Sequence, residues 1–156
     1  GVNESKDIQS WVNFVTKLND LPIYLWGLSM GTASILLSLK DGYGDNVKGI
    51  IADCGFNNPY TQMVDIIDQH TFRFIAKIIM VFSNIYVKTK LKISLKKYDA
   101  KEYLKNNTIP ILFVHGEKDN VVITNDINKA LSSLKTGSPR QVVFYRCHTT
   151  SIFLKR

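Results

Sequence analysis

The spacing of apolar residues along the chain changes between two periods, and each period predicts one kind of element. Apolar residues recur every three or four positions at 5–19, 30–40 and 124–135, which predicts helices with a buried face. Four short and almost wholly apolar runs have instead the pattern of parallel strands that are covered on both faces. These runs are residues 23–26, 47–53, 109–116 and 141–145.

Strands that alternate with helices predict an α/β fold, in which a parallel sheet has helices on both faces and right-handed crossovers. With 156 residues, 45% of them hydrophobic, the chain can bury one core, so we expect a single domain over 1–156. The connection 57–108 is too long for an ordinary crossover. Its apolar run 72–87 is too short and too charged to span a membrane. We expect a helical cap insertion over the carboxyl edge of the sheet, with an apolar underside; an extended core helix is the alternative.

The chain is basic, with a formal net charge of +7, and much of the excess lies in the lysines of residues 88–97. Two interpretations stay open for this segment. It is either a solvated basic face or a contact with an anionic membrane surface or an acidic partner. No nucleic-acid-binding motif accompanies the lysines, so nucleic acid is not an expected partner.

Two cysteines, Cys54 and Cys147, are too few for a disulfide framework. If a third strand separates the strands that they follow, the distance between them is about 9–10 Å, which exceeds the span of a disulfide. We therefore expect two thiols and a reducing, cytoplasmic environment. Residue 1 is Gly1 rather than methionine, so we expect the chain to begin inside a longer sequence that holds any targeting segment.

The strongest candidate for chemistry is the sequence Gly-Leu-Ser-Met-Gly at 27–31, between the first predicted strand and the next helix. Gly-x-Ser-x-Gly in this setting is typical of a nucleophile elbow, because the two glycines allow a turn that lifts the hydroxyl of Ser29 above the strand end. The N–H groups and the dipole of the following helix favour negative charge there. The structural alternative is a glycine turn with an ordinary helix-capping serine.

Ligands of parallel α/β sheets bind at the carboxyl ends of the strands, where the sequence supplies Ser29, Asp53, Asp119 and His148 in turn. Nucleophilic acyl transfer needs such a set. A serine hydroxyl becomes a nucleophile when a histidine takes its proton, and a carboxylate orients and stabilises the resulting imidazolium. The chain order Ser29, Asp119, His148 is the order of α/β-hydrolases.

Several motifs together carry a resemblance to this superfamily. They are Gly-Leu-Ser-Met-Gly at 27–31, Ile-Ile-Ala-Asp at 50–53, Pro-Ile-Leu-Phe-Val-His-Gly-Glu-Lys-Asp at 110–119 and a histidine after the last strand. The chain resembles the carboxyl-terminal half of an α/β-hydrolase, its last four strands, and is most similar to the serine aminopeptidase and prolyl-oligopeptidase-like branch. The resemblance implies Ser29 as nucleophile, Asp119 as triad acid, His148 as base and the N–H of Met30 as one oxyanion donor.

Other residues compete for these roles. Asp53 is the alternative acid, because some members of the superfamily take the acid from that strand; otherwise it caps a turn. We interpret Glu117 as a solvated turn residue, His115 as a structural residue of a tight turn and His70 as a side chain of the cap. The family usually has glycine shortly before the histidine, whereas this chain has arginine and cysteine before His148.

The resemblance implies a serine hydrolase that cleaves an ester or amide bond through an acyl-enzyme, without a cofactor. No histidines or cysteines stand at metal-ligand spacing. The apolar cap predicts a substrate with an apolar acyl or side-chain portion. The resemblance covers only the last four strands of the α/β-hydrolase sheet. The earlier strands of that sheet would carry the second oxyanion donor and a neighbour for the 23–26 strand. Three interpretations therefore stay open. The chain is a portion of a longer hydrolase, a catalytically inactive truncated hydrolase that acts as a binding module, or an enzyme completed by a partner chain.

Overall fold

The computed structural model describes residues 2–116, 119, 121–122 and 140–145. Four parallel strands form one sheet in the order β1-β2-β3-β4. They are β1 (Ile23–Leu28), β2 (Val47–Asp53), β3 (Ile111–Gly116) and β4 (Arg140–Tyr145). The predicted parallel α/β sheet is therefore confirmed. In the register of the sheet Leu28 lies beside Asp53, and Asp53 lies beside Val114, so the carboxyl ends of the first three strands meet at one edge.

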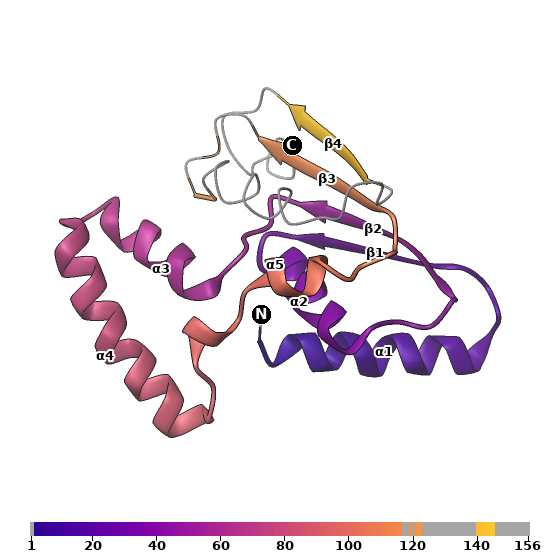
Figure 1. The fold of residues 1–156 in the computed structure, drawn as a ribbon, viewed down its shortest axis with the longest axis horizontal. Helices are drawn as coiled ribbons and strands as arrows, with labels where there is room; N and C mark the ends of the chain where they lie inside the picture. The colour runs from indigo at the N-terminus through magenta and orange to yellow at the C-terminus, as the bar shows by residue number, and fades with distance from the viewer. Residues whose placement is uncertain (1, 117–118, 120, 123–139, 146–156) are drawn as a thin grey trace, which may run out of the picture.

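Three helices form a layer on one face of this sheet (Figure 1). They are α1 (Glu4–Leu18), α2 (Met30–Ser38) and the short α5 (Ala100–Leu104), and a 3₁₀ turn, η1 (Leu39–Asp41), follows α2. The helix α2 is packed between β1, α1 and α5, and its residues 32–38 are all buried. This burial explains why α2 has no charged residue and no polar face, unlike an amphipathic helix. The core around it includes Leu36, Ile50 and Phe113, and full burial of each such side chain contributes about 1.5–3 kcal/mol.

The other face of β1 is open among the residues that the structure describes. Tyr24 and Trp26 are 66% and 57% exposed, and Ile51 on β2 is 36% exposed. The run 23–26 predicts a strand that is covered on both faces, and the described residues cover only one. Beside β1 there is an open, mostly apolar groove of about 350 Å³, lined also by Trp11 of α1. The helix predicted at 124–135 lies outside the described residues.

The long connection after β2 forms a helical insertion, as predicted. It contains α3 (Pro59–Asp68), α4 (Arg73–Leu91) and the 3₁₀ turn η2 (Leu95–Lys97), which we call the α3–α4 arm, and it returns to the sheet layer through α5. The arm lies on the side toward which the strands point (Figure 1). Its own small core joins Val64 of α3 to Ala76 and Met80 of α4.

The helix α4 differs from the two interpretations of its sequence. Ala76 and Met80 are its buried residues, so it is not a core helix. Its extensive contacts are with α3 and η2, and much of its apolar surface is exposed rather than turned onto the sheet edge. It ends at Lys92, whose backbone is left-handed with φ of 57°. Across the described part of the chain, no helix combines the length and the apolar character that a membrane crossing requires.

Candidate active site

Ser29 lies at a sharp turn between the end of β1 and the start of α2. Its backbone has φ of 51° and ψ of −110°, a conformation that is strained for any residue other than glycine. Two hydrogen bonds hold it there. The N–H of Ser29 donates to the carbonyl of Asp53 at 2.8 Å, and the carbonyl of Ser29 accepts from the N–H of Ala33 at 3.1 Å. The strand end and the helix therefore both fix the position from which the side chain of Ser29 projects.

Of the two glycines in the motif, only Gly27 is required by its surroundings. A Cβ atom on Gly27 would lie 2.5 Å from the N atom of Thr32 and 2.6 Å from the carbonyl carbon of Gly31, because the start of α2 folds back over the strand end. A Cβ atom on Gly31 would meet nothing within 4 Å. The motif predicts that both glycines are needed for the turn, whereas close packing requires only Gly27.

Thr32 joins the three segments that meet at this turn, a role that no sequence pattern predicted. The residue is fully buried, and its hydroxyl lies within hydrogen-bonding distance of the carbonyl of Gly27 and, at 2.8 Å, of the carbonyl of Asp53. A Cβ atom on Gly55 would lie 2.2 Å from Cγ2 of Thr32, so the loop after β2 packs directly on this methyl group. The one feature of the sequence that could have indicated this role is the position of Thr32 immediately after the second glycine of the motif.

The candidate acid Asp53 ends β2 beside the turn that holds Ser29. Its carbonyl accepts from the N–H of Ser29 and contacts the hydroxyl of Thr32. The next residue, Cys54, is buried and has φ of 45°, with its N–H donating to the carbonyl of Val114 at 2.9 Å. The backbone of Asp53 therefore supports Ser29 directly.

Asp119, the other candidate acid, lies in the turn after β3 and is 7% exposed. Its Oδ1 accepts from the N–H groups of Val121 at 2.8 Å and Val122 at 2.9 Å, which fixes the carboxylate to its own turn. Its Oδ2 is buried and has no hydrogen-bond donor among the described residues. Since a buried carboxylate oxygen without a donor is costly, this atom is where a further N–H would be accommodated.

The structure describes two of the three histidines, His70 and His115. His115 is fully buried, and its Nε2 donates to the carbonyl of Val122 at 2.9 Å, so the ring stabilises the turn that carries Asp119. His70 is exposed in the link between α3 and α4. His148, Glu117 and the second cysteine lie outside the described residues.

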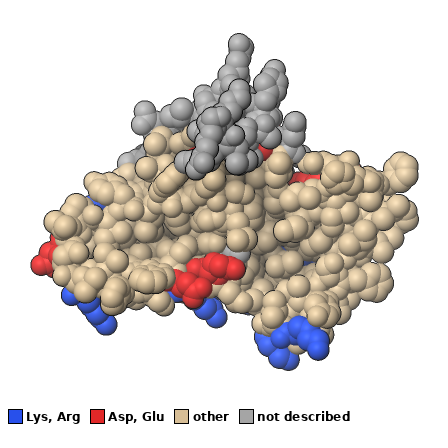
Figure 2. All heavy atoms as spheres, turned by 180° about the vertical axis from the view of Figure 1, so that it is seen from behind, with Lys and Arg blue, Asp and Glu red and all other residues tan. Residues whose placement is uncertain are grey.

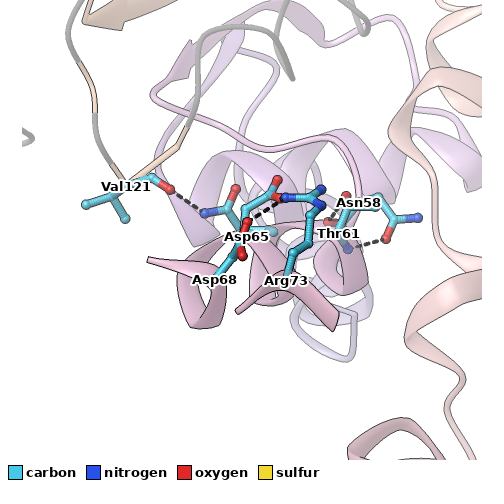
Figure 3. A network of polar contacts seen from close by, with 7 residues as sticks. Asn58, Thr61, Asp65, Asp68, Arg73 and Val121 are labelled. Carbon is cyan, nitrogen blue, oxygen red and sulfur yellow. Dashed lines mark hydrogen bonds and ion pairs between the residues drawn. The ribbon is translucent and has the colours of Figure 1, made fainter. Parts of the chain in front are cut away.

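The helix α3 is attached to the turn of Asp119 through a buried side chain that the sequence analysis also misses. Gln62 is 4% exposed, and its Nε2 donates to the carbonyl of Val121 at 2.7 Å (Figure 3). The side chain of Asn58 caps the start of the same helix by accepting from the N–H groups of Tyr60 and Thr61. The first helix of the arm is thus attached to the turn of Asp119 through Gln62, whereas Asn58 stabilises the first turn of the helix itself.

Ion pairs join α3 to the start of α4. The guanidinium of Arg73 lies 3.0 Å from the carboxylate of Asp65 and 2.9 Å from that of Asp68 (Figure 3). The hydrogen bond to Asp68 is the largest cause that raises the pKa of Arg73, and Asp65 raises it as well. Because these groups are partly exposed, the ion pairs orient the two helices more than they stabilise them.

Comparisons with known proteins identify the fold. No family model and no curated protein sequence matches the chain. Solved structures do match, and they include esterases and peptidases of the α/β-hydrolase superfamily. The chain therefore has part of the α/β-hydrolase fold, as the resemblance implied.

Three of these structures illustrate the similarity. Dipeptidyl peptidase 4 of Porphyromonas gingivalis has a TM-score of 0.67 over 97% of this chain and 20% of its own, at 21% identity. The esterase domain of a Rhodothermus marinus protein has a TM-score of 0.65 over 96% of this chain, at 14% identity. The acylaminoacyl peptidase of Pyrococcus horikoshii has a TM-score of 0.65 over 93% of this chain and 23% of its own, at 17% identity. The chain spans 60% of the length of the esterase domain.

Proposed function

We propose that the chain carries the catalytic serine of a serine hydrolase that cleaves an ester or amide bond. The observation that carries this proposal is the strained backbone of Ser29 between β1 and the buried helix α2, in an α/β-hydrolase fold. A strained residue at the end of a strand is a feature of functional sites, since the surrounding hydrogen bonds must hold it in place. Ser29 attacks the substrate carbonyl and forms the acyl-enzyme, which water then hydrolyses. No cofactor takes part.

The N–H of Met30 is the proposed oxyanion donor. Met30 is the first residue of α2, where N–H groups have no acceptor within the helix and the helix dipole favours negative charge. In this role it stabilises the oxygen of the tetrahedral intermediate. One such donor contributes about a hundredfold to a thousandfold to turnover.

Asp119 is the proposed triad acid, in preference to Asp53. Its Oδ1 is held by two N–H groups of its own turn, and its buried Oδ2 is left to accept the Nδ1–H of a histidine. His148 is the proposed base, on the strength of the chain order Ser29, Asp119, His148. In this scheme His148 takes the proton of Ser29 and passes it to the leaving group.

The substrate proposed for this site has an apolar acyl or side-chain portion. Support comes from the α3–α4 arm, which lies beyond the carboxyl ends of the strands and carries exposed apolar residues such as Met63 and Phe72. A series of acyl esters and aminoacyl amides tests this, with the specificity constant rising as the acyl or side-chain group becomes more apolar. A flat series would contradict it.

Labelling with a fluorophosphonate tests the catalytic proposal. We expect the probe to modify Ser29, and Ser29→Ala to abolish the signal. Ser10→Ala is the matched control, because Ser10 is an exposed serine of α1 whose hydroxyl bonds only to the carbonyl of Lys6 among the described residues. Labelling that survives Ser29→Ala, or no labelling of the folded chain, would contradict the proposal, and the second result would favour a binding module without activity.

A further inference from the structure

The helix α4 has an apolar face that the described residues do not cover. Four of its large apolar side chains, which recur at helical spacing, are between 45% and 68% exposed. They are Phe74, Ile78, Phe82 and Ile85. Because positions three and four apart share one side of a helix, these four form a continuous stripe. Ala76 and Met80 face the other way, into the small core that α4 shares with α3.

The same helix lies in the most basic part of the chain. Residues 73–97 contain seven lysines and arginines and no aspartate or glutamate. The formal charge of this segment, +7, equals the net charge of the whole chain. At about 100° per residue, Lys77 and Lys88 stand along one border of the apolar stripe and Lys90 beyond the other. All three are exposed. Figure 2 shows a group of basic side chains at the lower end of the arm, next to a surface with little charge.

These two features together select one kind of partner. A second copy of the chain would bring the same lysines against each other, since a symmetric contact uses the same patch on both subunits. The helix is not long and apolar enough to cross a membrane. An apolar stripe bordered by lysines, with no acidic residue, is instead the pattern of helices that lie in the surface of an anionic bilayer.

We propose that α4 docks the protein on the surface of an anionic lipid bilayer. The helix lies parallel to the bilayer, with Phe74, Ile78 and Phe82 among the upper acyl chains and Lys77 and Lys88 among the lipid phosphates. The small core of the α3–α4 arm stays intact in this arrangement, because Ala76 and Met80 are on the opposite side of the helix.

Cosedimentation of the full chain with lipid vesicles tests this proposal. We expect binding to vesicles of phosphatidylcholine that contain about a quarter of phosphatidylglycerol, and little binding to phosphatidylcholine alone. Added salt should weaken the binding, because it screens the attraction between the lysines and the lipid phosphates. Equal binding to both kinds of vesicle would overturn the electrostatic part of the proposal.

Replacing the apolar contacts tests the face itself. Phe74 and Phe82 are 68% and 67% exposed, so Phe74→Gln with Phe82→Gln should leave the helix folded, as circular dichroism would show. Vesicle binding should fall by about tenfold or more, since two aromatic side chains no longer enter the bilayer. Fluorophosphonate labelling of Ser29 without vesicles should be unchanged, which separates this proposal from the catalytic one. Unchanged vesicle binding would overturn it.

Two triple variants of equal charge test the position of the lysines. Lys77→Gln with Lys88→Gln and Lys90→Gln should weaken binding to the anionic vesicles by about a hundredfold. A control triple removes three exposed lysines elsewhere and should bind more tightly than the α4 triple. Its substitutions are Lys17→Gln, Lys40→Gln and Lys48→Gln.

Two results would overturn docking by α4. One is an equal loss of binding in both triple variants, which would indicate attraction by net charge alone. The other is self-association of the chain without vesicle binding, measured by sedimentation velocity and abolished by the Phe74 and Phe82 changes. That second result would assign the face to a contact between copies.

Discussion

Gly27 and Gly31 belong to one five-residue motif but have different physical roles. The backbone of α2 approaches Gly27 so closely that no side chain fits, whereas space is open around Gly31. The strain of the turn is carried by Ser29, whose φ is positive, and it is opposed by the hydrogen bond from its N–H to Asp53. Close packing at Gly27 therefore restricts the sequence of the motif as much as the proposed chemistry of Ser29 does.

Alanine at the two glycines should therefore have opposite effects. Gly27→Ala should lower the free energy of unfolding by about 3 kcal/mol or more, because the new methyl group overlaps backbone that cannot move aside. Gly31→Ala should raise it by about 0.5–1 kcal/mol, because the position is helical and alanine restricts the unfolded chain. Urea unfolding followed by circular dichroism measures both. Equal losses in the two variants would show that Gly31 is also sterically required.

Tyr43 makes the stability depend on pH in the alkaline range. Burial raises the pKa of Tyr43 above its ordinary value of 10.0, and a hydrogen bond with Ser38 partly offsets this effect. A pKa that is higher in the folded state means that the group contributes its full stability below about pH 10, and that the contribution is lost as pH rises through the folded pKa. The unfolding free energy should therefore fall as the pH rises above 10.

Tyr43→Phe checks this dependence. The variant should lose less stability than the wild type between neutral pH and alkaline pH, measured by urea unfolding. At neutral pH it should cost about 1 kcal/mol or less, because Ser38 still donates to the carbonyl of Ile35 at 2.6 Å. Identical pH profiles for the two proteins would contradict the assignment. Burial also raises the pKa of Tyr103, which therefore contributes to the dependence in the same direction.

Within the arm, α3 has the most direct structural connection to the candidate site. It follows the loop after β2, and through Gln62 it holds the turn that carries Asp119. Its other side packs on α4. The arm is therefore anchored to the carboxyl edge by its first helix, while α4 is anchored mainly through α3 and η2.

Gln62→Leu tests this anchor. The variant keeps a side chain of similar size but leaves the carbonyl of Val121 without this donor, so the free energy of unfolding should fall by about 1–2 kcal/mol. The rate of fluorophosphonate labelling should fall as well if Asp119 is the triad acid, since its turn is less well fixed. Met63→Leu, on an exposed position of the same helix, should change stability by about 0.5 kcal/mol or less. Equal stability of the two variants would contradict the role of Gln62.

For the whole molecule, the described residues form two packed regions of unequal burial. The sheet and its helical layer share one core, whereas the arm has a small core of its own. Seven consecutive residues of α2, 32–38, are buried, but only Ala76 and Met80 are buried in α4. Local opening free energy follows the number of buried apolar contacts, so the two regions should differ in stability.

Native-state hydrogen exchange measures this difference. We expect the amides of α4 to exchange at least tenfold faster than those of α2, because opening the arm exposes less apolar surface than opening the sheet layer does (about 1.4 kcal/mol for each factor of ten). Exchange of α4 would slow on anionic vesicles if the helix docks there. Equal protection of the two helices in solution would indicate that the arm and the sheet unfold as one unit.

Local sequence patterns were sufficient to predict the four strands, the helices α1 and α2 and the helical insertion in their order, and to place Ser29, Asp53 and Asp119 after strand ends. Periodicity is a local property, because the side-chain spacing of a helix or strand is set by its own backbone, and the runs at 23–26 and 47–53 therefore predicted β1 and β2. The placement of Ser29 and Asp119 after strand ends followed from the rule for parallel sheets. The motif likewise indicated the α/β-hydrolase fold.

Which side chains meet, and which faces stay uncovered among the described residues, depends instead on how the elements pack. Thr32 reaches the carbonyl of Asp53, and Gln62 reaches that of Val121, which is 59 residues further along the chain. No local pattern encodes such a pair, since the contact exists only when the strands and helices have packed. The exposure of Trp26 and of the α4 stripe has the same origin, because an apolar run shows that burial is favourable but not what is present to cover it.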